Sequence, residues 1–256
     1  MGVLNVTPDS FFDGGKFNTT EKAVEHALKM IADGADIIDI GGESTKPGAK
    51  PLSVEEEKKR IIPILHKLRQ ATQCPISIDT TKSFVAAAAI DFGATLVNDI
   101  SAGQFDSEML PLVSRSKVRI CLMHMQGTPE TMQKNPHYKN VVEEVKVFLR
   151  QRMTACLEAG IEKEKIVLDP GIGFGKSVED NLALLKNLDQ FQDLGCPILI
   201  GTSRKSFIGA LTGATVEDRL PGSLATLAAA VQKGAQIVRV HDVAETKQFL
   251  SLFAQL

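Results

Sequence analysis

The chain has 256 residues, which exceeds the average domain of about 150 but is a usual length for a one-domain α/β barrel. Hydrophobic residues make up 43% and charged residues 23%, so the chain can bury a large core and is neither disordered nor fibrous. The formal net charge of −2 gives no overall field for nucleic acid or anionic lipid. No apolar run approaches the roughly 18 residues of a membrane helix and no export signal opens the chain, so we expect no nucleic-acid or membrane partner and a cytoplasmic location.

Cysteine spacing gives little support to disulfide or zinc chemistry. The four cysteines are far apart, never form a Cys-x-x-Cys pair, and lie in or beside apolar segments. This pattern is typical of reduced, partly buried thiols rather than of a disulfide framework or a zinc cluster. The cysteines are Cys74, Cys121, Cys156 and Cys196.

Short β-branched runs alternate with longer amphipathic stretches along the whole chain. Each run is nearly continuously apolar, which is typical of a parallel strand that is covered on both faces. We therefore expect eight strands with helices between them. The expected strands cover residues 2–6, 36–40, 75–78, 95–97, 118–123, 165–168, 197–200 and 236–240.

Several helix boundaries can be recognised between these strands. Residues 18–21 and 53–56 resemble capping boxes, in which a short polar side chain and a later Glu satisfy free N–H groups of the first helical turn. Other helical patterns end at a glycine, which can adopt a left-handed conformation and turn the chain toward the next strand. These glycines are Gly34, Gly93, Gly160 and Gly234.

The strand–helix units average about 32 residues, and no Pro-, Gly- or Ser-rich linker or composition change divides them. We therefore predict an α/β protein with one domain, a (β/α)8 TIM barrel over residues 1–256. In such barrels the binding site forms at the carboxyl ends of the strands.

Polar or charged residues stand at the end of nearly every predicted strand. A single Asp or Asn after a strand is a common helix cap, but a purely structural barrel does not need polar groups at almost every strand end. We therefore expect these side chains to face one mouth of the barrel and to form a site there. They are Asn5, Asp39, Asp79, Asn98, Asp99, His124, Asp169, Ser203, Arg204, Lys205, Arg239 and His241.

The loops after the first two strands are polar, rich in glycine and longer than the usual connection of about two to six residues. They cover residues 5–15, which include Phe11 and Phe12, and residues 41–48. Because both mix apolar with chargeable side chains, we interpret them as mobile covers over the site rather than as flexible surface loops.

The segment 169–177 follows a strand, precedes a helix and is rich in glycine, like a phosphate-binding loop. A Walker A motif needs a glycine where this chain has Pro170, which lacks an N–H group and has a fixed φ. We therefore expect the glycines to allow close approach of a flat ligand. In that interpretation Phe174 is a packing face and Asp169 is a hydrogen-bond acceptor.

Two further segments suit anions. Residues 202–209 place cations and hydroxyl groups where a short helix begins, and helix N-termini favour anions, so we expect a carboxylate site there. The alternative is that Arg204 and Lys205 are solvated surface charges. Arg239 and His241 alternate on the last strand, so both side chains face the same way and can bind one oxyanion.

Together these segments resemble the dihydropteroate synthase family, in its bacterial form, over essentially the whole chain. The resemblance implies a (β/α)8 barrel and a transferase of folate biosynthesis that is the target of sulfonamides. The implied reaction joins (7,8-dihydropterin-6-yl)methyl diphosphate to 4-aminobenzoate and gives 7,8-dihydropteroate and diphosphate. The matching segments are residues 4–11, 41–45, 47–48, 78–80, 97–99, 122–124, 169–175, 203–207 and 239–241.

The resemblance implies a pterin site made of residues from several strand ends. Asp79, Asn98 and Asp169 are expected to accept hydrogen bonds from the N–H groups of the ring. Lys205 is expected to donate to the ring carbonyl, and Met123 to pack near the ring.

For the diphosphate, the resemblance implies binding by Asn5, Arg239 and His241. Asn5 is also expected to touch a Mg2+ ion whose other ligands are phosphate oxygens and water, so the metal arrives with the substrate. Asp13 is expected to support positive charge on the pterin methylene, and Thr45 to order the closed site. The expected catalytic residues are Asp13, Thr45, Lys205, Arg239 and His241.

The resemblance places 4-aminobenzoate between the side chains of Phe11, Pro47 and Phe174, beside Thr45. Ser206, at a helix N-terminus, is expected to hold the carboxylate of this substrate. A homodimer through the outer helices is the corresponding expectation for assembly.

Two positions depart from the family pattern. Lys46 stands where the second loop usually has Arg, and a point charge cannot reproduce a bidentate contact with diphosphate. Phe12 stands where Ser is common and adds apolar area to the first loop.

Two other functions share part of this pattern. A pterin-binding methyltransferase domain that serves a corrinoid partner would have the Asp and Asn contacts, but it would not need segments 203–207 and 239–241. A non-catalytic pterin-binding homologue would not need the full set of Asn5, Asp13, Thr45, Lys205 and Arg239. The presence of all of these residues favours the synthase.

Overall fold

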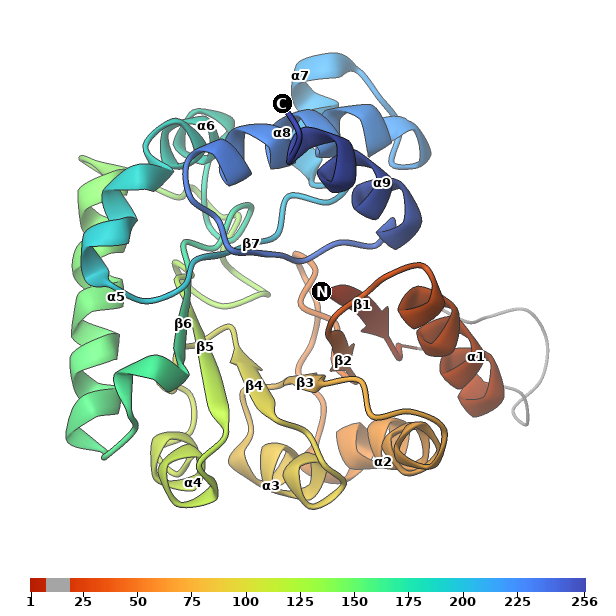
Figure 1. Cartoon of the computed structure of the whole chain (residues 1–256). Coiled ribbons are helices and arrows are strands. Elements are labelled where there is room, and N and C mark those ends of the chain that lie inside the picture. Colours follow the sequence, from red (N-terminus) through yellow and green to blue (C-terminus); the bar gives the residue numbers. More distant parts are fainter. Residues whose placement is uncertain (8–18) are drawn as a thin grey trace.

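The computed structural model describes residues 1–7 and 19–256, and strands alternate with helices along this part of the chain (Figure 1). The strands are β1 (Gly2–Asn5), β2 (Ile38–Gly41), β3 (Ile76–Asp79), β4 (Leu96–Asp99), β5 (Arg119–Met123), β6 (Ile166–Asp169), β7 (Leu199–Ile200) and β8 (Ile237–Val238). The α-helices are α1 (Thr19–Ala32), α2 (Val54–Ala71), α3 (Ser83–Asp91), α4 (Met109–Ser116), α5 (Val141–Glu158), α6 (Val178–Lys186), α7 (Ser206–Thr212), α8 (Leu220–Gln232) and α9 (Val243–Phe253). The 3-10 helices are η2 (Lys163–Lys165), η3 (Leu188–Leu194) and η4 (Glu217–Arg219).

The strands close into a barrel. Strands β1 to β6 form a parallel sheet in chain order, and β7 pairs in parallel with β8. Parallel bridges from Leu168 to Ile198 and from Gly2 to Val240 join the two sheets at both edges. Figure 1 shows the helices arranged around these strands. The predicted (β/α)8 TIM barrel is confirmed, and every expected strand has both ends within two residues of the prediction.

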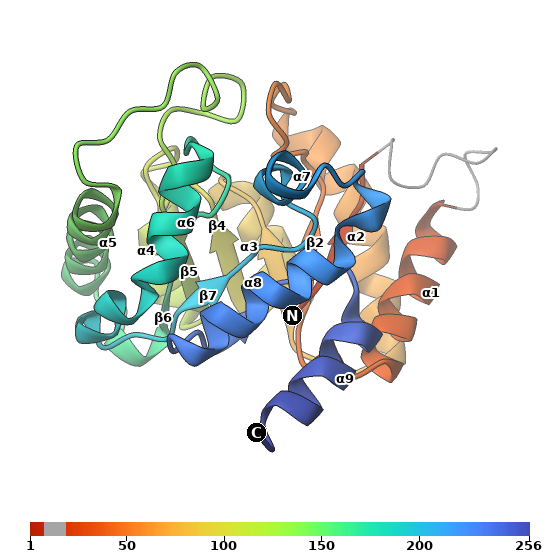
Figure 2. The same ribbon diagram turned by 90° about the horizontal axis from the view of Figure 1, so that it is seen from above.

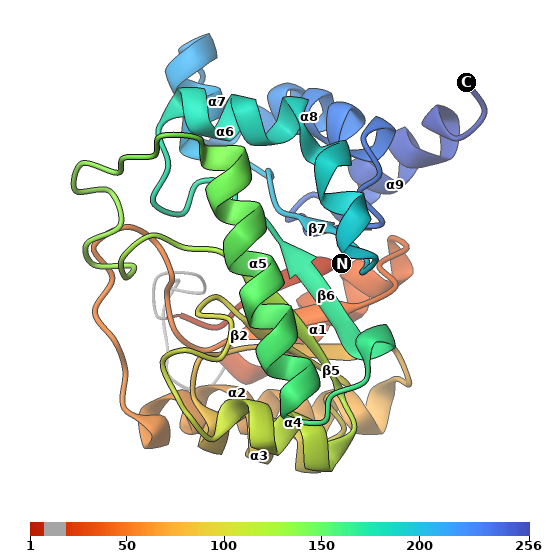
Figure 3. The ribbon, with the colours of Figure 1, turned by 90° about the vertical axis from the view of Figure 1, so that its left-hand side faces the viewer.

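The connections that follow the strands gather at one end of the barrel. In Figures 2 and 3 the loops after β2 and β5 lie at the same end of the molecule as α7, whereas the C-terminal end of α9 points the other way. This end holds the carboxyl ends of the parallel strands, where barrels of this kind carry their sites.

The helices begin and end largely where local sequence predicts. The Ser53 side chain accepts the N–H of Glu56, and the Glu56 side chain accepts the N–H of Ser53, so this capping box is confirmed. The box expected at residues 18–21 falls partly outside the described residues. The glycine termini are also confirmed, with φ of +101° at Gly34 and +93° at Gly234 and positive φ at the other two.

Side chains alternate between the outside and the inside of the barrel. Outward residues pack against the helices, as do Ile38, Ile40, Ile76 and Ile78, each at most 1% exposed. Inward residues near the amino-terminal end form a separate apolar cluster that fills the barrel floor. The cluster consists of Met1, Leu96, Cys121, Val167 and Leu199, with Ile37 and Ile237 packed against it.

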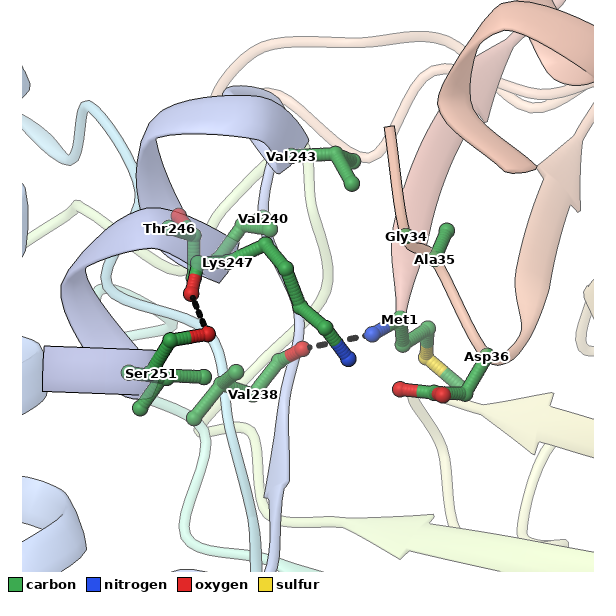
Figure 4. A pocket seen from close by; sticks show the side chains of 11 residues that line it. Met1, Gly34, Ala35, Asp36, Val238, Val240, Val243, Thr246, Lys247 and Ser251 are labelled. Atoms are coloured by element: carbon green, nitrogen blue, oxygen red, sulfur yellow. Dashed lines mark hydrogen bonds between the residues drawn. The ribbon is translucent and has the colours of Figure 1, made fainter. Parts of the chain in front are cut away.

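A cavity of about 600 Å³ lies between α9 and the amino ends of β1 and β2. In Figure 4 the amino group of Met1 meets the carbonyl of Val238 at 2.9 Å, with Asp36 and Lys247 nearby. Burial lowers the pKa of this amino group. None of the polar strand-end residues lines this cavity, so it is not the predicted site.

Replacing Ser53 with Ala removes one half of the capping box of α2. The N–H of Glu56 loses its acceptor, so we expect the free energy of unfolding to fall by about 1 kcal/mol in urea denaturation. Ser251→Ala is the matched control, because that exposed hydroxyl bonds the Lys247 carbonyl inside α9 and its loss should cost less than about 0.5 kcal/mol. Equal losses in both variants would contradict the capping role.

Candidate active site

The upper layer of inward side chains lines a cavity at the carboxyl-terminal mouth. Leu96 and Val167 lie in the barrel floor, and Asn98 and Asp169, two positions later on the same strands, point inward one layer higher. The cavity has a volume of about 450 Å³, and nine of the residues that the family resemblance assigns to the site line it, together with the strand-end residue Ser203. Its lining is Thr45, Asp79, Asn98, Ile100, Met123, Asp169, Ile172, Phe174, Gly201, Ser203, Lys205, Arg239 and His241.

Arg239 is the centre of a buried network at this mouth. Its Nε donates to Asp39 Oδ2 at 2.6 Å, and its Nη2 donates to Asp79 Oδ2 at 2.8 Å. Asn98 Nδ2 donates to the same oxygen of Asp39 at 3.1 Å. Asp39 is 0% and Asp79 7% exposed, so solvent screens these charges little. The network fixes side chains from β2, β3, β4 and the end of β8 relative to one another.

Burial brings the titration of Asp79 close to neutral pH. It raises the pKa of Asp79 to about 7; the Arg239 guanidinium opposes this shift and the Asp39 carboxylate adds to it. Although burial disfavours its charge, Arg239 has a pKa above its ordinary value because Asp39 and Asp79 stabilise the cation. Arg239 is therefore a permanent cation, while Asp79 can gain or lose a proton near neutrality.

Asp169 and Lys205 supply a second pair of opposite charges. Asp169 Oδ1 accepts the N–H of Gly171 at 2.7 Å. Burial raises the pKa of Asp169, against that hydrogen bond and the charge of Lys205. Burial also lowers the pKa of Lys205 to about 8. The Lys205 ammonium lies 4.1 Å from the centre of the Phe174 ring, a cation–π contact that joins the polar and aromatic parts of the cavity.

His241 lies at the outer rim of the cavity, with its ring partly open to solvent. Its Nδ1 is 3.0 Å from Ser203 Oγ, and its backbone N–H donates to the same oxygen at 3.2 Å. Loss of solvent on its inner side, together with the charge of Arg239, lowers the pKa of His241 to about 4. The imidazole is therefore neutral at physiological pH and binds by hydrogen bonding rather than by charge.

The segment 169–177 does not act as a Walker-type phosphate loop, in agreement with the prediction. Lys176, the lysine that such a motif would direct at phosphate, is 3% exposed and donates to the carbonyls of Gly171 and Phe174. Burial lowers the pKa of Lys176 to about 7. Asp169 and Phe174 line the cavity instead, as expected for an acceptor and a packing face.

Three predicted site residues are not among the described residues that line the cavity. Asn5 is partly exposed at the end of β1, Pro47 is exposed in the second loop, and Ser206 is exposed at the first position of α7. Contacts with them require a ligand that extends beyond the cavity or a change in the loops. Phe11, Phe12 and Asp13 lie outside the described residues.

Two strand-end residues point away from the mouth, so the expectation that they face it is wrong. Asp99 and His124 each directly follow an inward residue and therefore point outward. The Asp99 carboxylate accepts the N–H groups of Ser101 and Gly103 at 2.7 and 2.8 Å, which caps the following turn. The His124 ring packs edge-on against Phe148, with ring centres 4.9 Å apart.

Arg204 is neither the expected anion ligand nor a solvated surface charge. Its Nε and Nη2 donate to the two carboxylate oxygens of Asp242 at 2.9 and 2.7 Å. Its Nη1 donates to the carbonyls of Val216 and Glu217, each at 2.9 Å. Arg204 therefore joins the loop after β7 to the residue before α9 and leaves Lys205 to enter the cavity.

Sequence reasoning missed the apolar walls and the function of one carboxylate. Ile100, Ile172 and Gly201 line the cavity without having been singled out. Asp39 was identified as a strand-end residue, but its ion pair with Arg239 joins the second and last strands and has no local sequence signal. Alternate residues of a strand share a face, so Asp39 shares a face with Gly41, and Gly201 with Leu199. This alternation would have placed Asp39 and Gly201 on the inner face.

The second loop is attached at its base and near its tip. Lys82 Nζ donates to Glu43 and to the fully buried Glu57, in each case at 2.7 Å. The N–H of Gly48 donates to the carbonyl of Pro129 at 3.0 Å. The first contact holds the base of the loop to the connection that follows β3, and the second holds its tip to the connection that follows β5.

The barrel and its cavity define a class of protein. Carboxylate, carboxamide and ammonium groups that converge in one cavity match a flat ring with amine, amide and carbonyl edges. The guanidinium and imidazole suit an oxyanion attached to that ring. The chain is therefore a TIM-barrel enzyme with a site for a polar heterocycle next to an anionic group.

Known proteins place the chain within that class. The sequence pattern of the family described as pterin binding enzyme matches residues 1–241. Dihydropteroate synthase from Haemophilus influenzae is 48% identical over 253 residues, which cover 99% of this chain and 92% of that protein. The structure of Xanthomonas albilineans dihydropteroate synthase with 4-aminobenzoic acid has a TM-score of 0.94 and 46% identity, covering 100% of this chain and 91% of that one. The complex of that enzyme with 7,8-dihydropteroate gives 0.90 and 43%, with 100% and 92% covered.

The chain belongs to the dihydropteroate synthases, within the pterin-binding enzymes. The predicted family, the predicted barrel and the predicted transferase activity in folate biosynthesis are confirmed. All four cysteines are free thiols, as expected. Within residues 1–7 and 19–256, no helix is long and apolar enough to cross a membrane, and no group of three His, Cys, Asp or Glu side chains could hold a metal ion.

Replacing Gly171 with Ala should disrupt the loop that carries Phe174. Gly171 has a φ of +71°, and an added Cβ would lie 1.9 Å from the carbonyl oxygen of His124. Overpacking against backbone and the left-handed conformation together should lower the free energy of unfolding by about 3 kcal/mol or more in urea denaturation. Gly48→Ala is the control, because its φ is +80° but no described atom lies within 4 Å, and it should cost about 1 kcal/mol. Similar losses in both variants would contradict the importance of the close approach.

Proposed function

We propose that the cavity at the barrel mouth condenses (7,8-dihydropterin-6-yl)methyl diphosphate with 4-aminobenzoate to give 7,8-dihydropteroate and diphosphate. The observation that carries this proposal is the grouping of Asp79, Asn98, Asp169 and Lys205 with Arg239 in one small cavity. The proposed catalytic set is Asp13, Thr45, Lys205, Arg239 and His241.

The pterin would bind through complementary hydrogen-bonding edges. Asn98 donates from Nδ2 to Asp39, so its carbonyl oxygen is the atom that we assign to a ring N–H. Asp79 and Asp169 are buried acceptors for the amine and amide N–H groups of the ring, and Lys205 is the donor to its carbonyl. Ile100 and Met123 provide apolar surface for the faces of the ring.

The charges of the site match those that develop as the C–O bond breaks. Three carboxylates, Asp39, Asp79 and Asp169, face two cations, Arg239 and Lys205, so an ionised site carries an excess of one negative charge. This excess stabilises positive charge on the pterin methylene. Asp13 of the first loop would add a further carboxylate to this negative charge.

The leaving diphosphate would be met by Arg239, His241 and Ser203. Neither ion pair of Arg239 uses Nη1, and we assign that group to the phosphate oxygens. His241 starts neutral, and an adjacent phosphate would raise its pKa and strengthen its hydrogen bond. Negative charge on the departing oxygens is thus stabilised by preorganised donors.

We propose that a Mg2+ ion enters the site bound to the diphosphate of the pterin substrate. A carboxamide oxygen is a suitable Mg2+ ligand, and Asn5 offers one at the partly exposed end of β1, where phosphate oxygens and water would complete the shell. When bound, the ion neutralises charge on the diphosphate.

Bond formation needs little proton transfer from the protein. The electron pair of the C–O bond leaves with the diphosphate, and the lone pair of the 4-aminobenzoate nitrogen forms the new C–N bond. That nitrogen then loses a proton to solvent. An arylamine is already unprotonated near neutral pH, so we propose that positioning and charge stabilisation, rather than a general base, provide the acceleration.

The 4-aminobenzoate site is proposed around Phe174 and Thr45, which both line the cavity. Phe11 and Pro47 would cover the ring from the two loops, and Ser206 would bind the carboxylate at the first turn of α7. A sulfonamide carries the same arylamine and would compete for this site.

We also propose a cytoplasmic homodimer. The free thiols support a reducing compartment. Exposed apolar side chains on the outer surface, including Leu211 at 56% and Val216 at 49% exposure, offer area for a second copy. Analytical ultracentrifugation that found a monomer at micromolar concentration would contradict the dimer.

Replacing Arg239 with Met should lower the rate of diphosphate release by about 100-fold or more, because one preorganised donor to the leaving group is lost. The assay contains the pterin diphosphate, 4-aminobenzoate and Mg2+. Arg115→Met, an exposed position on α4, should leave the rate unchanged. Corrinoid-dependent methyl transfer by the wild-type chain, without diphosphate release, would overturn the proposed function.

Pterin affinity should have a bell-shaped dependence on pH. Ionised Asp79 accepts hydrogen bonds through both oxygens, whereas the neutral acid is a weaker acceptor and turns an O–H donor toward the ring N–H groups, so affinity rises as pH increases through about 7. Lys205 loses its charge as pH increases through about 8, so affinity falls again above that value. Calorimetry with 6-hydroxymethylpterin measures the profile.

Matched variants separate the two limbs of this profile. Arg239→Met removes the charge that opposes protonation of Asp79, so the rising limb should move to higher pH. Asp79→Asn should abolish that limb. An unchanged rising limb in Asp79→Asn would show that another group controls it.

A further inference from the structure

Lys176 is a buried basic side chain that the proposed chemistry does not use. It is 3% exposed and is not among the described residues that line the cavity. Its Nζ lies 2.9 Å from Nδ1 of His124, 2.9 Å from the carbonyl oxygen of Gly171 and 3.0 Å from that of Phe174. An ammonium removed from water is costly unless its hydrogens are all bonded, so these acceptors define one position for the side chain.

The hydrogen bonds of Lys176 Nζ connect two loops. Gly171 and Phe174 belong to the connection between β6 and α6, whereas His124 begins the connection after β5. The N–H of Phe174 also donates to the carbonyl of Gly171 at 3.1 Å, which closes the turn that Lys176 binds. The donor to the Phe174 carbonyl is Lys176, at 3.0 Å, within the part of the chain that the structure describes. The backbone at Phe174 therefore depends on this lysine.

The His124 ring is a further, well-packed partner of the Lys176 amine. Burial and the charge of Lys176 hold the pKa of His124 far below its usual range, so the ring is neutral and Nδ1 can accept a hydrogen bond. The ring packs edge-on against Phe148 of α5. His124 thus adds a partner for Lys176 from a different loop than the turn that the lysine binds.

Asp169 does not depend on Lys176 in the same way. It pairs with Met123 in the β5–β6 ladder, and its carbonyl accepts the N–H of His124 at 3.0 Å. Loss of the lysine side chain would leave that ladder in place. The pterin acceptor and the aromatic ring in this connection are therefore positioned by different interactions.

We propose that Lys176 is a positioning residue for 4-aminobenzoate: by binding the carbonyls of Gly171 and Phe174, it holds the Phe174 ring against the arylamine substrate. This inference rests on the proposed function, which assigns Phe174 to that substrate. The lysine acts through Phe174 and touches neither substrate.

The test compares Lys176→Met with wild type in binding pteroate and 6-hydroxymethylpterin by calorimetry. Pteroate spans both substrate sites, whereas the hydroxymethylpterin occupies the pterin site alone. We expect pteroate to bind about tenfold more weakly or worse, and the pterin fragment to stay within about threefold of wild type. In steady-state assays the KM for 4-aminobenzoate should rise by a similar factor, with a smaller change in the KM for the pterin diphosphate.

Lys146→Met is the matched control for loss of a largely buried lysine. Its side chain is 13% exposed on α5 and pairs with Asp193 at 2.8 Å. This variant should leave both affinities unchanged. Lys176→Gln keeps a shorter hydrogen-bond donor, so it should lose less pteroate affinity than Lys176→Met. If Lys176→Met does not fold, Lys176→Gln replaces it in the comparison.

The results that would overturn the positioning role of Lys176 differ from the result that would reject the proposed reaction. Unchanged pteroate affinity in the folded variant, or equal losses for pteroate and the pterin fragment, would overturn the positioning role. Absence of diphosphate release by wild type would instead reject the proposed reaction, and the binding comparison would still decide the role of Lys176.

Discussion

One guanidinium between two buried carboxylates sets the arrangement of the barrel mouth. Arg239 bonds Asp39 at 2.6 Å and Asp79 at 2.8 Å, and neither carboxylate is well solvated. Buried ionised groups are tolerated when they are paired and hydrogen-bonded, so removal of one partner leaves the others unstable. The same interaction fixes Asp79 and Arg239 next to each other in the lining of the cavity.

Strand periodicity explains why these groups can meet. Apolar inward residues fill the barrel floor, and the next inward residue on several strands is polar. A shift of one residue on any strand would exchange its cavity-lining side chain for one that faces the helices. Asp99 shows this difference, because it directly follows Asn98 and serves the turn instead of the cavity. The floor thus provides the hydrophobic support that allows charge to be buried above it.

Features with local physical causes were predictable from the sequence. Alternating apolar runs located the strands, and the capping box at Ser53 and the glycine at Gly34 marked helix boundaries, because each depends on neighbouring residues alone. The site was predicted in part from motifs. What could not be predicted was pairing between distant groups: Asp39 and Arg239 are 200 residues apart, and Arg204 pairs with the Asp242 carboxylate rather than pointing into the cavity. Which charged groups pair with one another depends on which side chains the closed barrel brings together.

The seams of the barrel divide the site into two parts of different rigidity. The carboxylates of β3 and β6 belong to the continuous six-stranded sheet, whereas Lys205 and Arg239 follow the two-residue strands β7 and β8, which pair with each other and join that sheet through one bridge at each edge. Segments with fewer ladder bonds open locally at lower free energy than the sheet. The segments that carry Lys205 and Arg239 are therefore expected to open at lower free energy than the sheet, and the ion pairs from Arg239 to Asp39 and Asp79 oppose this opening by joining the last strand to the sheet.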